Sequence, residues 1–544
     1  MCRARKNLCF VCLVVCLAAC AAGCFPFPFA LMRWSEDGSV GVLLHEDGWA
    51  LVDGKTGQTT AFAKPSGRPP EDDADSVLYS QIPTVPNVSA DGNWLVYATN
   101  EPVEGLDETL RHLPASQVEM IEHDALLAGI FQLAAAAAKA VTPDVEPGTT
   151  SEALEHLSRN PLAASPTYCN LVSRYLRDRG EPAVRAALPP AAPEDAKVRP
   201  FPLMRLFLLP IDEAGKGPGR LIAANSFGIV HPRLSPDGRF VAYLSLSPPK
   251  AKDEKSPGFD LWVSSLKTDP VITVRVAQNV AYGYTWRPDS RAVACLMAAH
   301  PPSSEALSLA VLTVIQVADA EGSLVAKEAK DGAEPTDAGT REYLVGTLFG
   351  PFAVVAYHHT GRLLFSGAAF ILPASELQEP RLSIFAFDPI TRTVADVLPS
   401  SVSQKIDGPY FEISPDGNHL LIPIMSKGEM ENLMVYNLGE SQARGPLADK
   451  VKFSEVGYPA WKGPDHIACW VKPESALLNG AGLGEIGEHE TVLVEVDLEG
   501  NLVRVLIAPK PPTDKDKAVP EPAPPAEPPS PKPTSPEPAP REAP

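Results

Sequence analysis

The side chains of this sequence that could take part in chemistry are few and unevenly placed. Six of the nine cysteines lie near the N-terminus, at positions 2, 9, 12, 16, 20 and 24, and the others are Cys169, Cys295 and Cys469. Three cysteines spread over the body of the chain are too few and too scattered for a disulfide framework. Cys295 and Cys469 occupy similar apolar segments, AVACL and HIACW, which favours buried side chains over reactive thiols.

Motifs for nucleophilic, metal-dependent and phosphate chemistry are missing from the sequence. It contains no Gly-x-Ser-x-Gly, no His-Glu-x-x-His and no phosphate loop. His358-His359 is the one pair of adjacent histidines, and it falls in an expected turn, where neighbouring side chains point in different directions. We therefore predict no catalytic residue, no metal site and no cofactor, and the sequence favours a non-catalytic protein over an enzyme.

The first 25 residues have the pattern of an export signal. A short basic segment at residues 3–6 precedes an apolar run from 8 to 22, which is shorter than the roughly 20 residues of a membrane-spanning helix. The run ends in LAAC at 17–20, which resembles the lipobox of bacterial lipoproteins, and AAGC at 21–24 is a second version. The resemblance implies a signal peptide over residues 1–19 and lipidation of Cys20, or a signal peptide over 1–23 and lipidation of Cys24.

A lipidated cysteine would attach the protein to a membrane through palmitate-type acyl chains. No Asp follows either cysteine, which by resemblance to lipoprotein sorting in enteric bacteria implies the outer membrane. An ordinary secretory leader and an uncleaved anchor are the alternatives. We expect a lipid-anchored protein of the bacterial cell envelope that faces the periplasm.

One hairpin sequence recurs along the chain. LSPDGRFVAYL at 234–244 has near-copies at 88–98, 286–296 and 413–423. Pro, Asp and Gly supply the backbone angles and local hydrogen bonds of a tight turn, and the apolar run that follows predicts a strand. A second hairpin comes after the first, for example at 259–277. Each repeat is therefore expected to form four strands.

These four-strand units resemble the TolB-like, WD-type β-propeller repeat. We identify units that begin near residues 33, 88, 231, 284, 355, 411 and 460. The resemblance implies an all-β fold, a seven-bladed β-propeller over residues 30–508, with six or eight blades as alternatives. The turn residues that carry the resemblance are expected to be structural: Asp37, Gly38, Asp91, Gly92, Asp237, Gly238, Asp289, Gly361, Asp416 and Gly417.

Residues 101–200 interrupt the second unit with a helical pattern. SQVE at 116–119 is a capping box that opens an expected helix to about residue 141, and another helix is expected over 166–180, ending at Gly180. The sequence thus predicts an α-helical insertion in the second blade. Such an insertion either covers the central channel or offers a docking surface.

The C-terminal segment and the overall charge support two further predictions. In residues 509–544, 15 of 36 residues are proline and none is aromatic, so we predict a disordered, extended tail. The net charge of −20 makes nucleic acid an unsuitable partner, because the two polyanions repel each other.

Two functions remain open on these grounds. The first is a non-catalytic scaffold that binds another envelope protein or a peptide, for which the insertion 101–200 is the candidate docking surface. The second is an envelope enzyme, or a protein that binds a small ligand or glycan at the mouth of the propeller channel. Several His, Asp, Glu or Arg side chains that converge there with shifted pKa values would favour the second.

Overall fold

The computed structural model consists mainly of β-strands, from Met32 to Ile507. Among the residues that it describes, no helix is both long enough and apolar enough to cross a membrane. The described residues are 32–45, 48–63, 84–99, 112–114, 204–225, 228–246, 258–269, 271–298, 308–326, 340–348, 354–369, 383–399, 402, 410–426, 429–439, 442–444, 459–471, 478 and 491–508.

Four of the sheets contain four strands each, and consecutive strands pair antiparallel. The first holds β1 (Met32–Trp34), β2 (Val40–His45), β3 (Gly48–Asp53) and β4 (Thr59–Ala63). The second holds β5 (Asn87–Val88), β6 (Trp94–Thr99), β7 (Met204–Pro210) and β8 (Arg220–Asn225), with the 3-10 helix η3 (Ile211–Glu213) before β8. The other two are formed by β20 (Glu412–Ile413), β21 (His419–Ser426), β22 (Glu429–Asn437) and β23 (Gln442–Arg444), and by β24 (Ala460–Trp461), β25 (His466–Val471), β26 (Val492–Asp497) and β27 (Leu502–Ile507).

The fifth sheet has eleven strands. Its strands are β9 (Val230–Leu234), β10 (Phe240–Leu246), β11 (Phe259–Ser265), β12 (Ile272–Trp286), β13 (Ala292–Ala298), β14 (Ser308–Gln316), β15 (Thr340–Leu348), β16 (Val355–Tyr357), β17 (Leu363–Ala369), β18 (Ser383–Asp388) and β19 (Thr393–Asp396). Strand β12 pairs with β11 through its first part and with β13 through its last part. Strand β15 pairs with β14 and also with β17.

The all-β propeller is confirmed, but the prediction of seven blades is wrong, because the residues that the structure describes form five sheets. The units expected to begin near 231, 284 and 355 are joined in the eleven-stranded sheet. The physical reason is the segment 272–286, which has no proline and continues as one 15-residue strand. At Asn279, φ is 54°, and this kink turns the strand from its first partner to its second.

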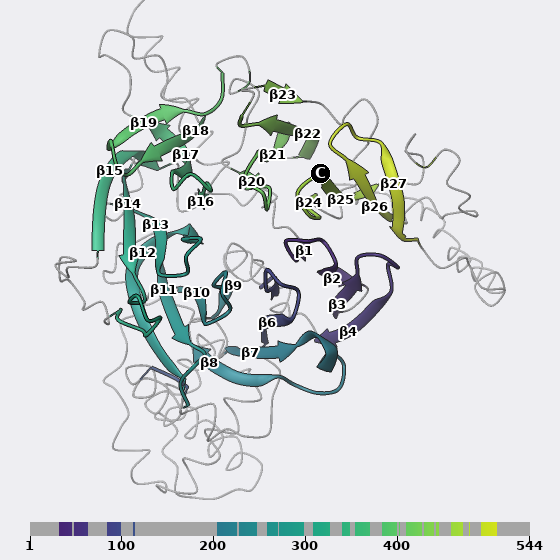
Figure 1. Ribbon diagram of the computed structural model, residues 1–544, viewed down its shortest axis with the longest axis horizontal. Helices are drawn as coiled ribbons and strands as arrows, with labels where there is room; N and C mark the ends of the chain where they lie inside the picture. The colour runs from purple at the N-terminus through teal and green to yellow at the C-terminus, as the bar shows by residue number, and fades with distance from the viewer. Residues whose placement is uncertain are drawn as a thin grey trace, which may run out of the picture.

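The sheets stand around a common axis (Figure 1). Strands β1, β9, β16, β20 and β24 lie nearest the centre of the ring, whereas β4, β19, β23 and β27 lie at its rim. Strand β1 contacts both β5 and β24, which closes the ring between the first and last described sheets. The hairpins and the ring confirm the resemblance to TolB-like propeller repeats.

The hydrophobic core lies between neighbouring sheets. Leu43 and Val52 of the first sheet pack with Trp470 and Leu493 of the last. Side chains of the second sheet pack in the same way against β9, β10 and β11. Because every sheet buries its faces against its neighbours, the fold depends on a complete ring. Cys295 and Cys469 are free thiols buried in this core, as predicted.

The repeat turns share one set of hydrogen bonds. Ser235 Oγ donates to Asp237 Oδ1 at 2.8 Å, and the same carboxylate oxygen accepts from the backbone N–H of Arg239 at 3.0 Å. Gly238 follows with φ of 68°, in the left-handed region that favours glycine. Equivalent Ser–Asp bonds occur at Ser35–Asp37, Ser89–Asp91 and Ser414–Asp416.

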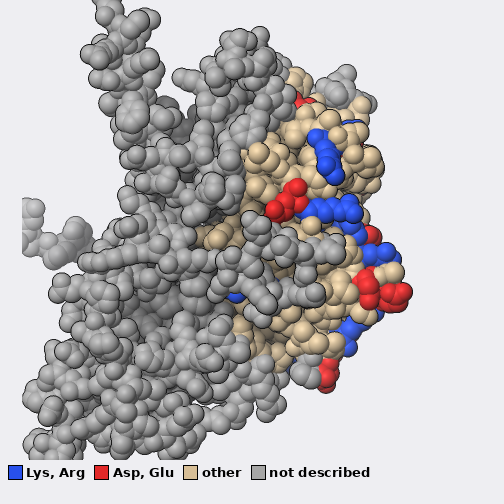
Figure 2. Space-filling model, turned by 90° about the vertical axis from the view of Figure 1, so that its left-hand side faces the viewer, with Lys and Arg blue, Asp and Glu red and all other residues tan. Residues whose placement is uncertain are grey.

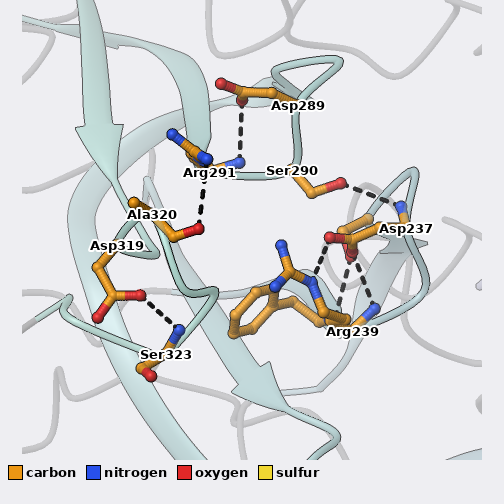
Figure 3. Close-up of polar contacts among 10 residues, drawn as sticks. Asp237, Arg239, Asp289, Ser290, Arg291, Asp319, Ala320 and Ser323 are labelled. Atoms are coloured by element: carbon orange, nitrogen blue, oxygen red, sulfur yellow. Dashed lines mark hydrogen bonds and ion pairs between the residues drawn. The ribbon is translucent and has the colours of Figure 1, made fainter.

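Adjacent turns are also joined to each other (Figure 3). The backbone N–H of Asp237 donates to Ser290 Oγ of the next turn at 3.0 Å, and Arg291 Nη2 donates to the carbonyl of Ala320 at 3.3 Å. Ser290 has φ of 62°, at the position where other repeats carry glycine. Ser290 adopts this left-handed conformation, and its hydroxyl links its own turn to the turn of Asp237.

Other expected features lie outside the described residues. These are the leader with Cys20 and Cys24, Cys169, and the tail over 509–544. The expected helical insertion over 101–200 also lies outside them, except for His112–Pro114, which form a turn and no helix.

Candidate functional site

Three charged side chains occupy the same position in different repeats. Arg33 on β1, Arg233 on β9 and Glu412 on β20 each lie two residues before the serine that opens a repeat turn. Since these inner strands surround the axis (Figure 1), equivalent positions lie at the same level of the ring. The corresponding residues of the other repeats are uncharged: Asn87, Thr285, Ala356 and Ala460.

We call Arg33, His231, Arg233, Tyr284 and Glu412 the axial cluster. Its charged members and His231 are surrounded by protein, yet each keeps part of its surface exposed to solvent. After burial, the positive charges of Arg33 and Arg233 contribute to the lowered pKa of His231, and they oppose the rise in the pKa of Glu412. The cluster therefore combines partial desolvation with access for a solute.

His231 holds the guanidinium of Arg33 in place. Arg33 Nη2 lies 3.2 Å from His231 Nδ1. The backbone of His231 has φ of 55°, and its carbonyl accepts a hydrogen bond from Tyr284 Oη at 2.7 Å. The imidazole also contacts the rings of Tyr282 and Tyr284, with centroids 5.3 and 5.5 Å away. A residue in this strained conformation persists because its surroundings fix it.

Arg233 is positioned by the neighbouring strand β12. Its guanidinium carbon lies 5.9 Å from the centroid of the Tyr284 ring, within the range of a cation–π contact. Arg233 Nη1 lies 3.5 Å from the carbonyl oxygen of Tyr284. The backbone carbonyl of Arg233 accepts from Trp286 Nε1 at 3.1 Å. Both the backbone and the side chain of Arg233 are thus held from β12.

The electrostatics of the cluster favour a net positive charge. Burial, followed by the charges of Arg233 and Arg33, lowers the pKa of His231 well below its usual value, so the imidazole is neutral at neutral pH. Burial and the charge of Arg33 lower the pKa of Arg233 to about 10, and Arg233 stays protonated at pH 7. Burial raises the pKa of Glu412, and the two arginines oppose that rise. Two guanidinium groups thus face one carboxyl group.

This arrangement is suited to binding an anion. Guanidinium groups donate paired hydrogen bonds to carboxylates and phosphates, and such bonds are stronger where water is partly excluded. The Nε atoms of Arg33 and Arg233 are buried without a hydrogen-bond partner. Burial raises the pKa of Tyr284, which makes it a poor proton donor. The cluster can therefore recognise a negatively charged group.

The turn residues expected from the sequence do not belong to this cluster. Each turn aspartate accepts hydrogen bonds within its own hairpin, and two pair with a neighbouring arginine: Asp237 with Arg239, and Asp289 with Arg287 Nε at 2.7 Å. Basic and acidic side chains accordingly lie side by side on the described surface in Figure 2. The turn glycine Gly361 has φ of 84°.

The histidine pair belongs to a repeat turn and not to the axial cluster. His358 Nδ1 lies 2.7 Å from Thr360 Oγ1 of the same turn, and burial together with His359 lowers the pKa of His358. In the described part of the chain, no three His, Cys, Asp or Glu side chains are grouped to hold a metal ion.

Sequence reasoning missed the axial cluster, although the sequence carries a signal for it. The signal appears when the repeats are aligned on their turns, because Arg33, Arg233 and Glu412 then share one column. Charges at the equivalent position of several inner strands lie around one axis once the ring closes. Three such charges in one column indicate a site.

Comparisons with known proteins add the following findings. No family model matches the chain, and no curated protein matches it. The chain resembles the solved structure of TolB from Acinetobacter baumannii, with 11% sequence identity and a TM-score of 0.33, over 55% of this chain and 58% of that chain. It resembles the β-propeller domain of the Trilobed protease from Pyrococcus furiosus, with 15% identity and a TM-score of 0.34, over 56% of this chain and 76% of that chain. It also resembles the acylaminoacyl peptidase of Pyrococcus horikoshii, with 14% identity and a TM-score of 0.35, over 57% of this chain and 42% of that chain. The chain thus spans less than two thirds of the TolB and of the peptidase.

Proposed function

We propose that this protein is a non-catalytic binding propeller of the bacterial cell envelope, which holds an anionic group of its ligand at the axial cluster. The observation that carries the proposal is the placement of Arg33 and Arg233 at one level of the ring, both partly exposed and with unpartnered Nε atoms. Glu412 balances one of the two positive charges. Among the alternatives that the sequence left open, this convergence favours binding at the axis.

Ligand-dependent stabilisation of the full chain tests this function. A ligand that binds the native state raises its stability by about 2.7 kcal/mol when present at 100 times its dissociation constant. We expect sodium succinate to raise the unfolding midpoint above that in sodium chloride of equal ionic strength. Arg33→Gln and Arg233→Gln should remove this rise, whereas Arg341→Gln, at an exposed position of β15, should keep it. The same rise in all four proteins would refute axial binding.

The lipid anchor is a separate part of the proposal. It rests on the segments LAAC and AAGC that end the apolar run of the leader. Metabolic labelling with palmitate should mark the wild type, and Cys20→Ala should abolish the label and release the protein from membranes. If Cys24→Ala has this effect instead, the second cysteine is the anchor. A label that survives in the double variant contradicts lipidation at either position.

A role for residues 101–200 in docking an envelope protein or peptide is also part of the proposal. It rests on the capping box at 116–119 and on the helices expected in this segment. Crosslinking in native membranes, followed by affinity purification of the full chain and of a chain lacking 103–200, tests it. A partner captured by both proteins would contradict docking through the insertion.

A further inference from the structure

Glu412 and the two arginines of the axial cluster belong to different sheets of the ring. It lies on β20, whereas Arg33 lies on β1 and Arg233 on β9, and in Figure 1 these strands stand on different sides of the centre. The positive charges of both arginines act on the Glu412 carboxyl group. The three residues hold the same position of three inner strands, which places them at one level around the axis.

These opposite charges do not pair with each other. Among the side chains that the structure describes, Glu412 forms no ion pair with either arginine. The arginines are held back by other groups, Arg33 by His231 Nδ1 at 3.2 Å and Arg233 by the ring and carbonyl of Tyr284. The backbone carbonyl of Glu412 is held in turn by Trp461 Nε1 at 3.3 Å.

Charges held apart in this way are complementary to a ligand that carries both signs. A partly buried charge without a partner costs free energy, and a ligand group of opposite sign recovers it. The arginine side offers two guanidinium groups to a carboxylate. The Glu412 side offers a carboxylate to a cation, and neutral His231 adds no positive charge that would repel one.

We propose that the axial cluster binds an amino-acid-type zwitterion, with its carboxylate at Arg33 and Arg233 and its ammonium group at Glu412. The inference rests on the proposed function and names the ligand class of that site. It assigns Glu412 the role of a specificity residue, since this residue decides between a zwitterion and a plain carboxylate of the same length.

Calorimetric titration of the full chain tests the assignment. The probes are glycine, β-alanine, γ-aminobutyrate and δ-aminovalerate, each compared with the carboxylate of equal chain length: acetate, propionate, butyrate or valerate. We expect the zwitterion whose length fits the separation of charges to bind about tenfold more tightly than its carboxylate, because a hydrogen bond to a charged group contributes on that scale. The length of the zwitterion that binds most tightly therefore also measures the distance between the two arginines and Glu412.

Matched variants separate this inference from the function on which it rests. Glu412→Gln keeps the shape of the side chain and should remove the tenfold preference while carboxylate binding persists. Arg33→Gln should lose both ligands, and Glu321→Gln, at an exposed position, should behave as wild type; an unchanged unfolding midpoint shows that each variant is folded. Equal affinities in the wild type, or a preference that survives in Glu412→Gln, overturn the zwitterion assignment alone. Failure of every probe and of succinate overturns the binding function as well.

Discussion

Neutralising Glu495 should destabilise the boundary between the last and the first sheet of the ring. Glu495 on β26 is 2% exposed, and its Oε2 lies 3.0 Å from Lys462 Nζ, whose side chain is 5% exposed. Lys462 Nζ lies 5.3 Å from the centroid of the Trp34 ring on β1. Arg504 Nε lies 2.6 Å from the same carboxylate, and the Arg504 side chain as a whole is 39% exposed. The carboxylate of the last sheet thus holds the cation that contacts the first.

The expected loss follows from these exposures. In Glu495→Gln the Lys462 ammonium stays buried without its counter-ion, and removal of one partner of a buried pair costs about 3–5 kcal/mol. Arg504 reaches water and adds little to this figure. Since domains are stable by about 5–15 kcal/mol, we expect the urea midpoint to fall by roughly 1 M or more, given typical dependences on denaturant.

Urea unfolding followed by tryptophan fluorescence measures this loss. Glu321→Gln, an exposed carboxylate, is the control and should change stability by less than about 0.5 kcal/mol. The double variant Lys462→Met/Glu495→Leu should regain most of the loss, because an apolar pair of similar volume replaces a buried ion pair at little cost. A loss of stability below about 1 kcal/mol in Glu495→Gln would refute the claim that Glu495 and Lys462 stabilise the boundary between the last and the first sheet.

Three further predictions concern the turns and the core. Ser290→Ala should be less stable than Ser290→Gly by about 1 kcal/mol, because both lose the bond to the Asp237 N–H but alanine keeps the strain of φ 62°; equal urea midpoints would contradict this. Hydrogen bonds, the strongest of them from Ser89, lower the pKa of Asp91 in the folded protein. The ionised Asp91 therefore stabilises the fold above the unfolded pKa of about 3.9, and this stabilisation is lost as the pH falls through the folded pKa. Asp91→Asn should accordingly flatten the pH dependence of unfolding below about pH 4, and an unchanged slope would rule this out. Burial raises the pKa of Cys295 and of Cys469 to about 12, so iodoacetamide at pH 8 should label them in urea and spare them in the native protein, as peptide mass spectrometry can establish.

The hairpins were predictable because their physics is local. Ser235, Asp237 and Gly238 contain in four residues the hydrogen bonds and backbone angles that the turn needs. The apolar run that follows each turn then predicts the strand. An all-β ring of such units follows from repetition, since a single unit cannot bury both of its faces.

The number of sheets and the axial cluster depend on contacts that no local pattern contains. Whether 272–286 ends at a turn or continues as one strand is decided by pairing with both β11 and β13. Arg33 and Arg233 each lie in a short strand beside apolar residues. From the sequence alone, a single charge in such a strand is interpreted as a side chain on the solvent-exposed face. They converge because the ring closes, and the same closure makes His231 a neutral group that holds Arg33.

The continuous strand β12 has a consequence for the way the molecule opens. Backbone hydrogen bonds run without a break from β9 to β19, so this arc can release one of its parts only by breaking a ladder. Among the described residues, no strand ladder joins the four smaller sheets to their neighbours, and such boundaries open at a lower free energy than a ladder. The ring therefore consists of one stiff arc and four hinged segments. Arg33 and Glu412 stand on hinged segments while Arg233 and Tyr284 stand on the arc, so breathing of the ring would change the span between the two ends of the site.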